Sequence, residues 1–192
     1  TWSGRPIVRA PGCSVLLTSA AMAKPNRIFL IGPMGAGKTT IGKQLAQSLG
    51  MDFNDSDQEI QRRTGVDIPT IFEYEGEEGF RQREAQAIEQ LTQVDNQVLA
   101  TGGGAVLRPE NRQHLSARGI VVFLACSPKQ QYERTYRDRN RPLLQTDDPL
   151  ERLEDLMAVR EPLYLSTADY TVSTEGRSAA SVANEILGII RG

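Results

Sequence analysis

RIFLIGPMGAGKTTIGKQLAQSL, residues Arg27 to Leu49, is the stretch of sequence that decides the fold. Its apolar start, Ile28 to Ile31, is too short for a helix and predicts a buried parallel strand. The next residues match G-x-x-x-x-G-K-[ST], the pattern of a phosphate-binding loop. Apolar residues then recur at helical spacing as far as Leu49, which predicts a helix. Strand, glycine-rich loop and helix therefore follow one another in the order that such a loop requires.

The residue types in this loop suit a nucleotide. Gly35 and Gly37 let the backbone curl so that its N–H groups wrap phosphates, and the start of the next helix adds a favourable potential. Lys38 brings positive charge to the β- and γ-phosphates, and the Thr39 hydroxyl is a candidate ligand for Mg²⁺. A plain glycine turn that caps a helix is the alternative, and the strand before the loop argues against it. The predicted ATP contacts are Gly35, Ala36, Gly37, Lys38, Thr39 and Thr40.

Composition narrows the class of protein. The 192 residues suit one domain, and a formal net charge of −2 argues against broad nucleic-acid binding. No apolar run approaches the length of a membrane span, so we expect no membrane association. Cys13 and Cys126 have no metal-ligand or disulfide spacing, which favours a reduced, cytoplasmic setting. We expect a monomer.

Residues 1–24 differ from the rest because they contain basic and hydroxyl side chains but no Asp or Glu. They fit the remnant of a targeting peptide, or upstream sequence with no part in function. We favour upstream sequence for residues 1–21 because Met22 lies just ahead of the first strand. The expected domains are an extension over 1–24 and a single folded domain over 25–192. His114, the single histidine, is predicted to be a solvated surface residue, which excludes histidine triads and histidine-rich metal sites.

Two carboxylates follow a short extended segment after the first helix. Asp57 can cap the helix predicted over 58–64. However, the later strands predicted over 98–100 and 120–125 end without a carboxylate, and a phosphate-binding-loop enzyme usually has one near its magnesium. Asp55 and Asp57 are therefore the candidates for metal-bound water and for a substrate hydroxyl.

Residues 67–94 are predicted to be mostly helical, with a break suggested by Gly76 and Gly79. Arg81 and Glu84 lie three residues apart in this segment. That spacing fits an ordinary surface ion pair of small energy.

Three glycines, Gly102 to Gly104, directly follow the strand predicted over 97–101. They fit either a plain turn or a platform on which a substrate lies against the backbone. We favour the platform because ligands bind at the carboxyl ends of parallel strands.

An arginine-rich segment, approximately residues 134–148, is predicted to be a loop because it contains Asn140, Pro142 and an Asp-Asp-Pro turn. It fits a solvated connector or, beside a nucleotide site, a lid whose guanidinium groups close over phosphates. Three elements complete the chain: a helix over 150–165 that carries Arg160, a strand near 170–172 and a helix over 178–190.

Together these motifs resemble the shikimate kinase family, a branch of the phosphate-binding-loop kinases, from about residue 25 to the C-terminus. The resemblance is carried by GPMGAGKTT (32–40), D-S-D (55–57), F-R-x-x-E (80–84), T-G-G-G (101–104), R-P-L-L (141–144) and R-x-P-L-Y (160–164). The family implies an α/β fold: a five-stranded parallel sheet in the order 2-3-1-4-5, with helices on both faces. It also implies transfer of a phosphoryl group from MgATP to the 3-hydroxyl of shikimate, in chorismate and aromatic amino acid biosynthesis.

The resemblance also implies roles for single residues. Asp57 resembles the residue that holds the substrate hydroxyls and takes the proton, and Asp55 the one that orients magnesium-bound water. Arg81 and Arg160 match the pair that binds the shikimate carboxylate. The remaining implied contacts are those of Gly103 and Gly104 with substrate, of Arg141 in the lid with the nucleotide phosphates, and of Arg177 near the adenine.

Two other functions share some of these features. One is a kinase for another small acceptor such as gluconate, which the glycine triplet together with Arg81 and Arg160 argues against. The other is a non-catalytic, kinase-like ligand sensor, which is expected to have lost Lys38 or Asp57 or to carry a DNA-binding segment. Neither of these changes occurs here.

Overall fold

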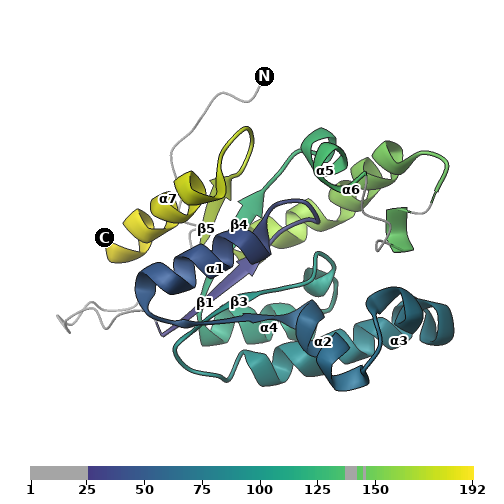
Figure 1. Cartoon of the computed structure of the whole chain (residues 1–192), viewed down its shortest axis with the longest axis horizontal. Coiled ribbons are helices and arrows are strands. Elements are labelled where there is room, and N and C mark those ends of the chain that lie inside the picture. Colours follow the sequence, from purple (N-terminus) through teal and green to yellow (C-terminus); the bar gives the residue numbers. More distant parts are fainter. Residues whose placement is uncertain (1–25, 137–141, 145) are drawn as a thin grey trace.

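A computed structural model of the chain describes residues 26–136, 142–144 and 146–192. At its centre is a sheet of five parallel strands in the order β2-β3-β1-β4-β5 (Figure 1). This confirms the predicted fold class and strand order. The strands are β1 (Arg27–Ile31), β2 (Asp52–Asp55), β3 (Gln97–Ala100), β4 (Ile120–Ala125) and β5 (Tyr170–Ser173). The predicted extension over 1–24 lies outside the described residues.

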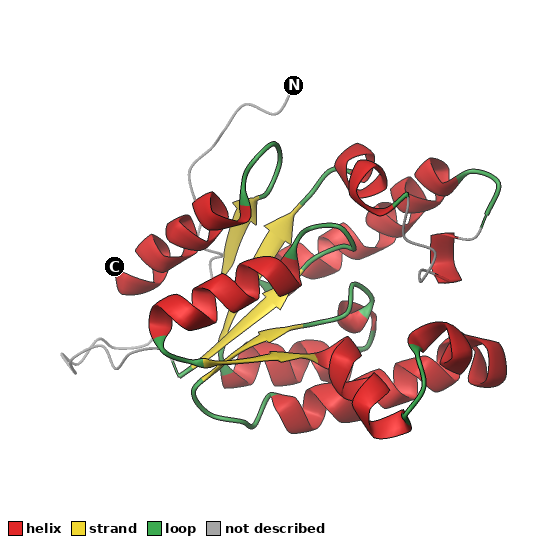
Figure 2. Cartoon of the chain, viewed as in Figure 1, coloured by secondary structure: helices red, strands yellow, loops and turns green. Residues whose placement is uncertain are grey.

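Helices cover both faces of this sheet (Figure 2). They are α1 (Lys38–Leu49), α2 (Ser56–Thr64), α3 (Ile68–Leu91), α4 (Pro109–Arg118), α5 (Pro128–Thr135), α6 (Pro149–Thr167) and α7 (Ala179–Arg191), with short 3₁₀ turns η1 (Ala105–Leu107) and η2 (Pro142–Leu144). Their starts follow local sequence rules, since Asp148 and Ser178 cap α6 and α7 by accepting backbone N–H bonds.

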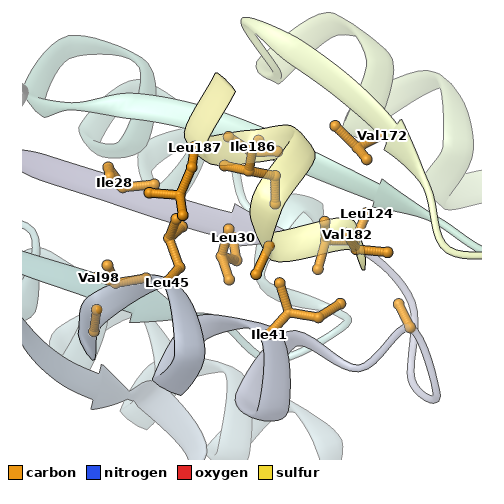
Figure 3. Close-up of a cluster of buried hydrophobic side chains, with 14 of the residues drawn as sticks. Ile28, Leu30, Ile41, Leu45, Val98, Leu124, Val172, Val182, Ile186 and Leu187 are labelled. Carbon is orange, nitrogen blue, oxygen red and sulfur yellow. The ribbon is translucent and has the colours of Figure 1, made fainter. Parts of the chain in front are cut away.

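Alternation along β1 divides the core into two layers. Ile28 and Leu30 face α1 and α7, in the cluster shown in Figure 3. Phe29 and Ile31 face the opposite side, where they pack in a cluster with residues of α3, α4 and α6. All four side chains are fully buried. A parallel strand covered on both faces is therefore apolar throughout, as the sequence of β1 predicts.

The helix α3 has a break where one was expected. Gly76 has φ 70° and ψ −178°, a conformation that a residue with a side chain rarely adopts, and helical geometry resumes after it. The part after Gly76 carries Arg81 and Glu84. None of the helices in the part of the chain that the structure describes has the length and apolar character of a membrane span.

The prediction for His114 holds only in part. Its side chain is half-buried, and its Nδ1 is enclosed by protein rather than exposed to solvent. The helix that carries it, α4, packs against both α3 and α6. The polar sequence of α4 does not reveal these two neighbours.

Candidate active site

The phosphate-binding loop lies between the end of β1 and the start of α1. Gly35 and Gly37 have φ of 76° and 86°, which confirms that the turn needs glycine at both positions. A Cβ on Gly35 would also lie 3.2 Å from backbone atoms of Gln131 in α5. Lys38 is largely buried, and its Nζ donates to the carbonyl oxygens of Gly32 and Pro33, both at 2.7 Å. The ammonium group is thus held over the loop.

Thr39 and Asp55, the predicted metal-binding pair, are in direct contact. The Thr39 hydroxyl donates to Asp55 Oδ2 at 2.8 Å, across 16 residues of sequence. A hydroxyl beside a carboxylate offers the hard oxygen donors that Mg²⁺ prefers. Among the described residues, no cluster of three or more His, Cys, Asp or Glu forms an all-protein metal cage. The donor set therefore fits a magnesium ion that keeps most of its waters and takes further ligands from phosphates.

The cap of α2 is Asp55 and not Asp57, which corrects the capping role considered for Asp57. The Oδ1 of Asp55 accepts from the backbone N–H groups of Asp57 and Gln58, at 3.0 and 3.3 Å. Asp55 can do this because it stays extended at the end of β2 while Asp57 is already helical. The side chain of Asp57 is therefore not used as the cap of its own helix.

Asp57 lies where two cavities meet. The larger, of about 600 Å³, is lined by the phosphate-binding loop, Asp55, Gln58 and Arg134 among others. The smaller, of about 90 Å³, lies towards α3 and α6 and includes Arg81 and Arg160. Four residues line both cavities: Met34, Asp57, Ile68 and Gly103. A group in one cavity is therefore next to a group in the other, with the Asp57 carboxylate between them.

The pair Arg81 and Glu84 is buried, which corrects the expectation of a surface ion pair. Glu84 is completely buried and Arg81 is 6% exposed, and Arg81 Nη1 donates to Glu84 Oε2 at 2.7 Å. The second arginine, Arg160, is 3% exposed and acts electrostatically on the same carboxylate. The structure thus brings Arg81 and Arg160 into one cavity, around Glu84, which the sequence analysis placed in a surface ion pair and gave no role in the site.

Burial and charge shift the pKa values of this cluster in opposite ways. Burial raises the pKa of Glu84 above its ordinary value, against the lowering effect of Arg81 and Arg160. Burial, with the positive charge of Arg81 adding to it, lowers the pKa of Arg160. For Arg81, burial lowers the pKa, but the charge and hydrogen bond of Glu84 outweigh it and raise the pKa.

The glycine triplet makes room for the protein's own side chains. A Cβ on Gly102 would lie 2.4 Å from Glu84 Oε1 and 2.8 Å from Asp57 Oδ1. A Cβ on Gly104 would lie 2.3 Å from the guanidinium nitrogens of Arg81. This is a second reason for glycine, besides the predicted contact with substrate. The triplet is held from one side by Ser56, whose buried hydroxyl accepts from the backbone N–H of Gly102 at 2.9 Å.

Arg134 was predicted to belong to the arginine-rich loop, but it lies in the last turn of α5. Its guanidinium donates to the carbonyl oxygen of Gly35 at 2.9 Å and to that of Thr174 at 3.1 Å. Arg134 therefore links the phosphate-binding loop to the loop after β5. The lid arginine of the resemblance, Arg141, lies outside the described residues.

Arg177 was expected near the adenine because of the family resemblance. It follows β5, donates to the carbonyl oxygen of Ser173 at 3.1 Å and pairs with Glu185 of α7. It does not line the larger cavity. Its predicted contact with the base remains a prediction.

The match to a family model agrees with this geometry. The model for shikimate kinase matches residues 34–191. The chain is 58% identical over 166 residues to a shikimate kinase of Methylococcus capsulatus, covering 86% of this chain and 93% of that protein. A shikimate kinase of Thioalkalivibrio sulfidiphilus is 59% identical over 165 residues, covering 86% of this chain and 87% of that protein.

Solved structures agree as well. The shikimate kinase of Acinetobacter baumannii, solved in complex with shikimate, superposes with a TM-score of 0.85 at 52% identity and covers 86% of this chain and 93% of its own. A gluconokinase of Sinorhizobium meliloti has a TM-score of 0.53 at 17% identity, with 88% of this chain and 93% of that one covered, so it shares only the fold. The predicted resemblance is confirmed: the chain belongs to the shikimate kinase family.

Proposed function

We propose that this chain transfers the γ-phosphoryl group of ATP to the 3-hydroxyl of shikimate, giving shikimate 3-phosphate and ADP. The observation that carries the proposal is the position of Asp57 between the loop-lined and the arginine-lined cavities. A kinase needs its two substrates in adjacent sites with their reacting groups aligned.

The larger cavity is the nucleotide half of the proposed site. Backbone N–H groups of the loop and the start of α1 receive the phosphates, and Lys38 neutralises part of their charge. The proposed ligands of Mg²⁺ are the Thr39 hydroxyl and, through water, Asp55, which already contact each other. Magnesium supplies charge neutralisation on the β- and γ-phosphate oxygens when it is bound.

The smaller cavity is the acceptor half. Arg81 and Arg160 can each bind a carboxylate through a planar guanidinium fork. Both are almost fully buried, so a carboxylate that reaches them leaves water and gains a strong interaction. The lining of this cavity offers two guanidinium groups as partners for an acceptor with a carboxylate such as shikimate.

Asp57 has the chemical role in this proposal. It orients the 3-hydroxyl of shikimate and accepts its proton as the oxygen bonds to the γ-phosphorus. The bond from that phosphorus to the β–γ bridging oxygen breaks, and ADP leaves. Closure of a lid over approximately 134–148, with Arg141 on the phosphates, excludes water as a competing acceptor. We also propose that the enzyme acts as a monomer, since residues of one chain line both cavities.

A coupled assay of ADP release tests the function. We expect ATP turnover to depend on shikimate, with no comparable turnover when gluconate or no acceptor is supplied. The matched control is Lys38→Ala, which should lose turnover with shikimate. Turnover that depends on gluconate instead of shikimate would show that gluconate is the acceptor. Binding of shikimate and ATP without turnover would show that the chain is a ligand sensor and not a kinase.

A further inference from the structure

Tyr164, the last residue of the R-x-P-L-Y motif, connects two parts of the proposed acceptor site. Its side chain is completely buried, and its hydroxyl donates to the carbonyl oxygen of Gly103, 61 residues away in sequence. The charge of Arg160, one turn earlier on α6, acts electrostatically on the same buried phenol. Tyr164 therefore tethers the backbone of the glycine triplet to the helix that carries Arg160.

The direction of the hydrogen bond follows from the groups involved. A carbonyl oxygen can only accept, so the Tyr164 O–H donates to Gly103. Burial raises the pKa of Tyr164, so this phenol keeps the proton that it donates.

The link to Gly103 also fixes a neighbouring group. The carbonyl of Gly103 and the N–H of Gly104 belong to one planar, trans peptide unit and point in opposite directions. Holding the carbonyl on Tyr164 therefore aims the Gly104 N–H away from α6. Glycine has no side chain to restrict its backbone, so an external tether has more effect here than at another residue type.

The ring of Tyr164 is held independently of its hydroxyl. It stacks on Phe123 of β4, with ring centroids 4.9 Å apart and an interplanar angle of 21°. A phenylalanine at position 164 would keep this stacking and lose only the hydrogen bond to Gly103. The role of the hydroxyl can therefore be separated from that of the core packing.

We propose that Tyr164 is a positioning residue that holds the Gly103–Gly104 peptide against the turn of α6 that carries Arg160, in the one arrangement that accepts the substrate's carboxylate end. This inference rests on the proposed function. Without the hydroxyl, the glycine backbone samples other positions, and binding of the acceptor must first select the competent one. Gly104 and Arg160 line only the smaller cavity, whereas Gly103 lines both. We therefore expect the larger effect on the acceptor.

The test compares Tyr164→Phe with Tyr170→Phe, a control in which a half-buried tyrosine of the edge strand β5, which lines neither cavity, loses its hydroxyl. Steady-state kinetics give KM for shikimate and for ATP, calorimetry gives the Kd for shikimate, and thermal unfolding reports the fold. For Tyr164→Phe we expect KM and Kd for shikimate to rise about tenfold, equivalent to about 1.4 kcal/mol. KM for ATP should stay within about twofold, as should all constants of Tyr170→Phe.

Three outcomes would overturn this assignment. Unchanged shikimate affinity in Tyr164→Phe, beside an active wild type, would show that the hydroxyl does not position the site. A parallel rise of KM for both substrates, with a lower melting temperature, would show a general structural role. A wild-type chain that binds no shikimate would overturn the proposed function, and the role of Tyr164 with it.

Discussion

Replacing Arg81 with methionine isolates the electrostatics of the buried cluster. Methionine keeps an unbranched stem but removes the charge that pairs with Glu84 at 2.7 Å. Glu84 is completely buried, so its carboxylate cannot regain solvation in the folded chain. It must remain charged with only Arg160 nearby, or take up a proton.

Proton uptake sets an upper limit on the charge penalty. Protonating a carboxyl of ordinary pKa 4.5 at pH 7 costs about 1.36 kcal/mol for each of about 2.5 pH units, or about 3.4 kcal/mol. At pH 5, about 0.5 unit above that pKa, the same route costs about 0.7 kcal/mol. We therefore expect Arg81→Met to lower the free energy of unfolding by about 2–3 kcal/mol at pH 7 and by less than about 1 kcal/mol at pH 5.

The sign of this pH dependence follows from the direction of the shift. Burial already raises the pKa of Glu84 in the folded chain, and losing Arg81 removes the largest opposing effect and raises that pKa further. A group with a raised folded pKa contributes stability that is complete below its unfolded pKa of about 4.5 and is lost as pH rises through its folded pKa. The variant should therefore be nearest to wild type in mild acid.

Urea unfolding followed by far-ultraviolet circular dichroism at pH 5 and pH 7 measures both values. Tryptophan fluorescence is less suitable because the single tryptophan is Trp2, outside the described residues. The matched control is Arg83→Met, in which the lost pair, with Glu75 on the same helix, is partly exposed. We expect that control to stay close to wild type. Equal stability of the two variants, or a penalty for Arg81→Met that grows towards pH 5, would refute the reasoning.

Three further predictions concern single groups. Thr39→Ala should raise the Mg²⁺ concentration needed for half-maximal turnover, and Thr39→Ser, which keeps the hydroxyl, should need about as much Mg²⁺ as the wild type. An unchanged Mg²⁺ requirement in the alanine variant would show that Thr39 is not a metal ligand. Gly104→Ala places a Cβ 2.3 Å from the guanidinium nitrogens of Arg81 and should raise KM for shikimate about tenfold or more. The control Gly188→Ala, whose Cβ meets nothing within 4 Å, should leave KM unchanged. Equal KM values in the two variants would show that a Cβ at position 104 does not displace Arg81. Hydrogen bonds from Arg62, with Arg63, lower the pKa of Glu59 to about 2, so its contribution to stability is present above about pH 4.5 and lost towards pH 2. Glu59→Gln should flatten the fall of the urea midpoint over that range, and an unaltered slope would show that Glu59 does not contribute.

Local sequence was sufficient for the elements that depend on neighbours in the chain. The phosphate-binding loop, the strand before it and the break at Gly76 were predicted because the conformational freedom of glycine and a short apolar run act over a few residues. The order of the strands was not available from spacing, because it depends on how distant segments pair. It came from the resemblance to a family.

The buried cluster shows where sequence reasoning stops. A spacing of three residues is the same for an exposed pair such as Arg62 and Glu59 and for the buried pair of Arg81 and Glu84. Burial is decided by what the helix packs against, which the spacing does not report. The bond from Tyr164 to Gly103 is hidden for the same reason, although both residues belong to motifs that were singled out.

Capping was also ambiguous at the level of sequence. Asp55 and Asp57 are both followed by helical sequence, and either carboxylate can accept a backbone N–H. The choice depends on the residue at which β2 ends, and helix boundaries are uncertain by one or two residues. The contact between Thr39 and Asp55 could be seen only in the fold, since it joins the start of α1 to the end of β2.

The most direct test of the account is the turnover of Asp57→Asn, measured together with its binding of both substrates. Asparagine keeps the size of the side chain and removes the proton acceptor between the two cavities. We predict that the variant folds, binds ATP and shikimate with affinities close to wild type, and loses kcat by about 100-fold or more. Near-normal kcat with intact binding would contradict the claim that phosphoryl transfer takes place at Asp57.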